Sequence, residues 1–109
     1  MARLLACPYP GSNVELTENR EKHILVKHPD LLPEHFEAIR RTLVDPDEVR
    51  RDSHFAATHL FSRWFEDIKR GKLVVVAVVS EALPVERHWV ATAYLARKVV
   101  QGATEWKRS

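Results

Sequence analysis

The chain has 109 residues, 45% of them hydrophobic and 29% charged, which excludes a disordered protein and fits one domain over residues 1–109 with a single modest core. Its 17 Lys and Arg against 15 Asp and Glu give a net charge of +2, too mild an excess to establish a polyanionic partner by itself. A domain of this size has too few residues to enclose a large substrate, so we expect any site to be an open cleft on one face.

The sequence indicates a cytoplasmic protein with no membrane segment. One cysteine, Cys7, excludes an internal disulfide and a multi-cysteine metal site, and it fits a reducing compartment. The stretch from Met1 to Cys7 is too short for a signal peptide, whose apolar part alone needs about 7–15 residues. No apolar run approaches the roughly 18 residues of a membrane span.

Two helices are predicted in the first half of the chain. Residues 1–16 are expected to be irregular, because they contain Pro8, Pro10 and Gly11. Thr17 is a suitable N-cap for a helix over residues 18–27, which Pro29 would end. A second helix is expected from about Pro33, since proline is tolerated in a first turn. The apolar stripe of this helix is formed by Phe36, Ile39 and Leu43. The segment Asp45-Pro46-Asp47 is expected to end it.

Beyond residue 47 the apolar period becomes that of strands. Thr58–Phe65 alternates, and Leu73–Val79 is a nearly continuous β-branched run, typical of a central strand covered on both faces. His88–Leu95 is a third predicted strand. Two helices followed by an antiparallel sheet make an α+β domain with both helices on one face.

The last predicted strand offers the clearest functional pattern. Alternation places one wholly apolar set, expected to pack on the helices, at Trp89, Ala91, Ala93 and Leu95. The opposite face would carry an imidazole, a hydroxyl and a phenol at His88, Val90, Thr92 and Tyr94. Such a row is either a functional surface or a consequence of the good strand propensity of Thr and Tyr.

Two histidines of the first helix are candidates for proton transfer. His23 and His28 are five residues apart and do not share a helix face. His28 lies at the helix C-terminus, where the helix dipole favours a protonated imidazole. No metal site is expected, because His54 and His59 are also five apart rather than the four that place two ligands on one helix face.

Arg63 is the remaining candidate. It follows His59 in the alternation of its strand, and a guanidinium can bind a phosphate with two hydrogen bonds and offset developing charge. The alternative is an ordinary surface arginine between Phe61 and Phe65.

Five segments, in this order, resemble a known family. They are Glu21–Asp30 with its histidines and His28-Pro29, His35–Val49 with Asp45-Pro46-Asp47, Leu73–Val76, Val90–Tyr94, and Lys98–Trp106 with Gly102. Together they resemble small phage- and bacterium-encoded nuclease-fold domains of the barnase–EndoU–colicin–RelE-like superfamily. The resemblance implies two N-terminal helices on one face of a four- to five-stranded antiparallel sheet. It also implies RNA cleavage without a metal or other cofactor.

The family positions map onto His23, His28, Thr92 and Tyr94, whereas Arg63 has no counterpart and comes only from the strand pattern. The implied mechanism has His28 or His23 take the ribose 2′-hydroxyl proton and Tyr94 or the other histidine protonate the leaving oxygen. Thr92 would bind a phosphate oxygen, Arg63 would offset charge with Lys27 or Arg97, and the product would be a 2′,3′-cyclic phosphate. Further RNA contacts are expected from Lys27, His88, Arg97 and Lys98.

Other functions fit the same sequence. One is a RelE-type toxin that cuts only ribosome-bound messenger RNA, and such an RNase could have an antitoxin or immunity partner. A second is a domain of this fold that binds RNA, including transfer RNA, or a protein without cutting. A third is an interaction protein that uses Phe61, Trp64 and Phe65 as its contact surface. The sequence leaves the oligomeric state open.

Overall fold

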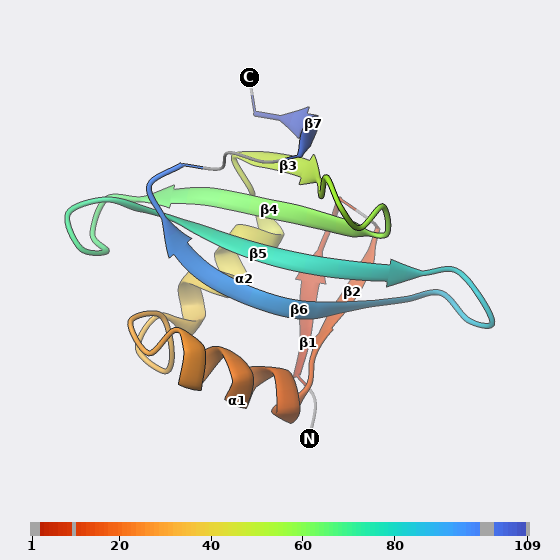
Figure 1. The fold of residues 1–109 in the computed structure, drawn as a ribbon, viewed down its shortest axis with the longest axis horizontal. Coiled ribbons are helices and arrows are strands. Elements are labelled where there is room, and N and C mark those ends of the chain that lie inside the picture. Colours follow the sequence, from red (N-terminus) through yellow and green to blue (C-terminus); the bar gives the residue numbers. More distant parts are fainter. Residues whose placement is uncertain (1–2, 10, 99–101, 109) are drawn as a thin grey trace.

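A computed structural model describes residues 3–9, 11–98 and 102–108. Within these residues the chain forms two helices and seven strands (Figure 1). The elements are β1 (Arg3–Cys7), β2 (Ser12–Leu16), α1 (Glu18–Lys27), α2 (Phe36–Val44), β3 (Glu48–Arg51), β4 (Thr58–Phe65), β5 (Lys72–Glu81), β6 (Arg87–Ala96) and β7 (Ala103–Lys107). All seven strands belong to one sheet in the order β1-β2-β6-β5-β4-β3-β7. Neither helix is long and apolar enough to cross a membrane.

The expected fold, two N-terminal helices on a four- to five-stranded antiparallel sheet, is wrong. The sheet has seven strands in the described residues and is mixed, because β2 pairs in parallel with β6 at Glu15 and Trp89. An N-terminal hairpin also precedes both helices, so the irregular segment expected over residues 1–16 is wrong for β1 and β2.

The N-terminal hairpin forms because the residues that break strands lie in its turn. Gly11 has a positive φ of 74°, which glycine adopts without strain, and its N–H donates to the Pro8 carbonyl at 2.9 Å. On either side of this turn the buried side chains alternate with exposed ones, which is the pattern of a strand with one face on the core. The buried set is Leu5, Cys7, Val14 and Leu16.

Helix α1 begins and ends where the sequence predicts. The Thr17 hydroxyl accepts a hydrogen bond from the Arg20 backbone N–H at 3.2 Å, and His28 is the C-cap. Helix α2 begins at Phe36, later than the predicted start at Pro33, and ends before Asp45 as expected. Both helices pack on the same apolar face of the sheet, and α2 lies behind the central strands in Figure 1. The contacts of this core include Ile24, Ile39, Leu43, Val74, Val76 and Val78.

Strand β5 is central, and apolar groups cover both of its faces as predicted. It pairs with β4 on one side and β6 on the other along most of its length. A second apolar cluster lies on the side away from the helices, and its members come from β4, β5 and β6 alone. Its buried residues are Leu60, Val75 and Ala77. We call this side of the sheet the open face.

A β-bulge in β6 overturns the predicted faces for residues 88–91, whereas the faces predicted for residues 92–95 are confirmed. Ala77 pairs with Thr92, but the next residue, Val78, pairs with Val90, so Ala91 is an extra residue in the ladder. Strict alternation fails across such a bulge. His88 and Val90 therefore lie on the helix side with Ala93 and Leu95, whereas Trp89, Ala91, Thr92 and Tyr94 lie on the open face.

Candidate functional site

Helix α1 lies beside β6 and brings His28 to Tyr94. Near the start of the helix, Arg20 Nη1 donates to the Ala91 carbonyl at 3.4 Å. Near its end, the centroids of the His28 and Tyr94 rings are 6.0 Å apart, with 40° between the ring planes. The helix thus places the imidazole against the phenol, although the two residues are far apart in the chain.

Thr92 lies on the same face of β6 as Tyr94, one alternation away. Thr92 pairs with Ala77 and Tyr94 with Val75, both buried residues of β5. The hydroxyl and the phenol therefore stand beside an apolar floor, with the imidazole in contact with the phenol. We call His28, Thr92 and Tyr94 the imidazole–phenol site.

The surroundings of Tyr94 fix its protonation state. Burial raises the pKa of the Tyr94 phenol, and the negative charge of Asp52 raises it further. The phenol consequently keeps its proton at neutral pH. In acid–base chemistry it can donate a proton or a hydrogen bond, but it is a poor base.

A second polar group lies on the other side of the open face. Arg50 is in register with Leu60, Ala77 and Thr92, three strand spacings or about 14 Å away from Thr92. Its Nε donates to Glu48 Oε2 at 2.9 Å, and the Thr104 hydroxyl donates to the same oxygen at 2.5 Å. Burial alone would raise the pKa of Glu48, but these two hydrogen bonds outweigh it and hold the pKa below its usual value. Sequence reasoning missed Glu48 and Arg50, because it recognised no strand at β3.

The structure does not bring the other predicted catalytic residues to this site. Arg63 lies on the helix side, where it pairs with Val74 in the ladder and Nη1 donates to the Asp45 carbonyl at 2.6 Å and to Asp45 Oδ2 at 3.1 Å. His23 is half-buried on α1 and has no hydrogen bond, ion pair or ring contact to any described residue.

Three of the four predicted RNA-contacting residues are sequence neighbours of this site. Lys27 directly precedes His28 in the last turn of α1. Arg97 and Lys98 directly follow β6 and are exposed. All three are cations, and each is close in sequence to His28 or to Tyr94. The fourth, His88, lies elsewhere.

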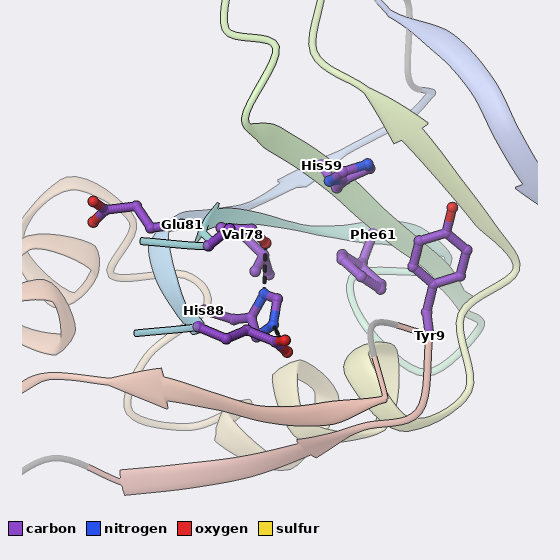
Figure 2. Close-up of a pocket in the computed structure, with 9 residues that line it drawn as sticks. Tyr9, His59, Phe61, Val78, Glu81 and His88 are labelled. Carbon is purple, nitrogen blue, oxygen red and sulfur yellow. Dashed lines mark hydrogen bonds and ion pairs between the residues drawn. The ribbon is translucent and has the colours of Figure 1, made fainter. Parts of the chain in front are cut away.

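His88 belongs to a cavity of about 440 Å³ on the helix side of the sheet. Tyr9 from the β1–β2 turn, His59 and Phe61 from β4, and the base of the β5–β6 hairpin surround it (Figure 2). Its lining residues are Tyr9, His59, Phe61, Val78, Ser80, Glu81, Ala82, Glu86 and His88. We call this cavity the histidine pocket.

Each histidine of the pocket is held by a carboxylate. His59 Nε2 is 2.8 Å from Glu105 Oε1, and Arg51 Nε is 2.7 Å from the other Glu105 oxygen. His88 Nε2 is 3.0 Å from Glu86 Oε2, and its Nδ1 is 2.6 Å from the Ser80 hydroxyl. The sequence did not suggest that His59 and His88 line one pocket, because it is the bulge at Ala91 that turns His88 to the side of the sheet on which His59 lies.

Charge distinguishes the two sites. The histidine pocket is lined or flanked by Glu81, Glu86 and Glu105, and its nearby cation, Arg51, is paired with Glu105. A phosphate would be repelled there. The imidazole–phenol site has the cations Lys27, Arg97 and Lys98 close to it in the chain and is the better place for a polyanion.

Comparison of the chain with protein-family models, curated proteins and solved structures gave no match. Within the part of the chain that the structure describes, no three His, Cys, Asp or Glu side chains gather closely enough to hold a metal ion.

Proposed function

We propose that the chain is a metal-independent endoribonuclease that cuts RNA on the open face by attack of the ribose 2′-hydroxyl on the adjacent phosphorus. The contact of the His28 and Tyr94 rings carries this proposal. It pairs a group that can accept a proton with a group that retains one at neutral pH. The products would be a 2′,3′-cyclic phosphate and a free 5′-hydroxyl. The single buried Cys7 fits the reducing cytoplasm as the location.

His28 is the base in this mechanism. Of the two histidines on α1, it is the one that lies against Tyr94, whereas His23 has no polar or ring contact to a described residue. A base must come within about 3 Å of the proton that it takes. The centroids of the His28 and Tyr94 rings are 6.0 Å apart, so the two rings are in contact and both groups can act on one phosphodiester bound beside them.

Tyr94 is the acid. A phenol with a pKa of about 10 or higher carries its proton at neutral pH, so Tyr94 can protonate the departing 5′-oxygen. The Thr92 hydroxyl is suited to donate to a non-bridging phosphate oxygen. Lys27 and Arg97 would offset the charge of the phosphorane. Arg63 takes no part in this mechanism, because it is engaged by Asp45 on the opposite side of the sheet.

The test is cleavage of end-labelled RNA in EDTA. Wild type should give ends that carry a cyclic phosphate. His28→Ala and Tyr94→Phe should each lower the rate by about 100-fold or more, which is the usual size of a general acid or base contribution. The matched control is His54→Ala, since His54 is exposed in the loop between β3 and β4. Replacing the ribose at the cut position by deoxyribose should abolish cleavage.

Three outcomes would contradict the proposal. Equal rates for wild type and His28→Ala would remove the imidazole–phenol site from the reaction. Cleavage that EDTA abolishes would exclude the metal-independent mechanism. No cleavage of free RNA, together with cutting of messenger RNA on added ribosomes, would replace the proposal by the RelE-type activity.

A further inference from the structure

The histidine pocket holds a linked serine, histidine and carboxylate. Ser80 Oγ is 2.6 Å from His88 Nδ1, and His88 Nε2 is 3.0 Å from Glu86 Oε2. Figure 2 shows both contacts as dashed lines at the wall of the cavity. Ser80 and His88 face each other across the β5–β6 ladder, and Glu86 lies in the hairpin loop. The ribonuclease proposal uses none of these residues.

The carboxylate determines which nitrogen of His88 is the base. An ionised carboxylate only accepts hydrogen bonds, so the proton of the neutral ring lies on Nε2, which faces Glu86. Nδ1 is then the acceptor and can take the proton of the Ser80 hydroxyl. This is the relay of serine hydrolases with the two ring nitrogens exchanged, since in those enzymes the serine faces Nε2.

The scaffold keeps this geometry rigid. His88 is 8% exposed, so its ring is held within the protein, whereas Ser80 lines the cavity and can meet a ligand. The Ser80 backbone N–H donates to the Ala57 carbonyl at 3.0 Å, which ties the hairpin to the loop before β4. A preorganised hydroxyl and base are what nucleophilic catalysis needs.

We propose that the histidine pocket is a second active site, which hydrolyses small esters with Ser80 as the nucleophile, His88 as the general base and Glu86 as the positioning residue. Phe61, Val78 and the Tyr9 ring offer an apolar surface for the acyl group. The carboxylates of Glu81 and Glu86 disfavour anions, so the substrate class is uncharged or cationic esters.

The reaction proceeds in two balanced steps. The Ser80 proton passes to His88 Nδ1 as Oγ bonds to the carbonyl carbon. The bond to the alcohol oxygen then breaks, and that oxygen takes the proton from Nδ1. In the second step water gives a proton to Nδ1, and its oxygen attacks the acyl carbon. The ester bond to Oγ breaks and Oγ regains the proton, which releases the carboxylic acid.

The first experiment is labelling of the full chain with a fluorophosphonate probe, followed by mass spectrometry of the modified peptide, beside hydrolysis of p-nitrophenyl butyrate. Wild type should carry one label, on Ser80. Ser80→Ala should lose the label, and its hydrolysis should fall to the rate in buffer. The controls are Ser12→Ala and His54→Asn, which alter an exposed serine and an exposed histidine outside the pocket and should leave both readouts unchanged.

Glu86→Gln separates catalysis from structure. The Glu86 side chain is 61% exposed, so its replacement should leave the melting temperature unchanged. If Glu86 positions the imidazole, labelling should slow by about tenfold or more. Absence of a label, a label on another residue, or equal hydrolysis by wild type and Ser80→Ala would overturn the proposal. The three residues would then be only a polar network that fixes the hairpin. These results are independent of RNA cleavage, which His28→Ala tests at the opposite face.

Discussion

Deletion of Ala91 is expected to leave the protein folded, because this residue is the extra one in the β6 bulge. Without it Thr92 and Val90 become neighbours and still face Ala77 and Val78, their present partners. Every other side chain of β6 keeps its face. In a regular strand, the deletion of one residue turns every side chain before or after the deleted position to the opposite face of the sheet.

The expected loss of stability is small. The deletion removes the acceptor of the Arg20 hydrogen bond, with a net contribution of about 0.5–1.5 kcal/mol, and one partly buried methyl group, about 0.8 kcal/mol. A total of about 1–2.5 kcal/mol is less than the free energy of unfolding of an ordinary domain, which is about 5–15 kcal/mol. Each kcal/mol lost should lower the melting temperature by about 4–8 °C.

The assay is urea unfolding followed by circular dichroism, with deletion of Ala77 as the matched control. Ala77 lies in β5 and has a partner on both β4 and β6, so its removal should shift the register of buried valines such as Val76 and Val78 and prevent folding. If the chain without Ala91 fails to fold, the bulge is not where the structure places it. If the chain without Ala77 folds as well as the chain without Ala91, the argument from register is refuted.

Three further predictions concern single groups. Gly102→Ala should weaken the attachment of β7 to β3, because the added Cβ would lie 2.3 Å from the Arg51 carbonyl oxygen and because residue 102 has a positive φ of 83°. Hydrogen exchange in β7 and β3 should become faster, and unchanged exchange would contradict this prediction. Cys7, whose pKa burial raises to about 12, should resist a disulfide reagent at pH 8 in the folded protein and react at once in urea. The Tyr94 pKa is raised on folding, so stability should be complete below about pH 10, the unfolded pKa, and fall as the pH rises towards the folded pKa. Urea midpoints at pH 8 and pH 11 should differ less for Tyr94→Phe than for wild type, and an equal difference would assign the loss to other groups.

The elements with strong local signals could be predicted from the sequence. Thr17 marks the start of α1, and the valines of β5 mark a strand covered on both sides. The N-terminal hairpin could not, because proline and glycine indicate a turn without showing whether strands flank it. Strand β7 carries no alternation of burial, since all five of its residues are exposed, and it becomes a strand only by pairing with β3.

The candidate sites show the same division. His28 and Tyr94, whose rings are in contact, were both singled out in the sequence, His28 from the helix end and Tyr94 from the part of β6 that follows the bulge. The histidine pocket could not be foreseen, because it depends on the bulge at Ala91, which places His88 on the His59 side. The position of Arg63 was missed for another reason, namely that its partner Asp45 comes from the end of α2, a contact between distant segments.

The first and last strands of the described chain lie at opposite edges of the sheet, β1 at one and β7 at the other. In Figure 1 the central strands β4, β5 and β6 run across the line that joins β1 and β7. A pulling force applied between β1 and β7 would therefore act along the hydrogen bonds that join β4, β5 and β6 and not along these three strands themselves. These hydrogen bonds would break one after another, so the domain should unfold at a low mechanical force. A protease or translocase that pulls on the chain from the β7 side would first separate β7 from β3.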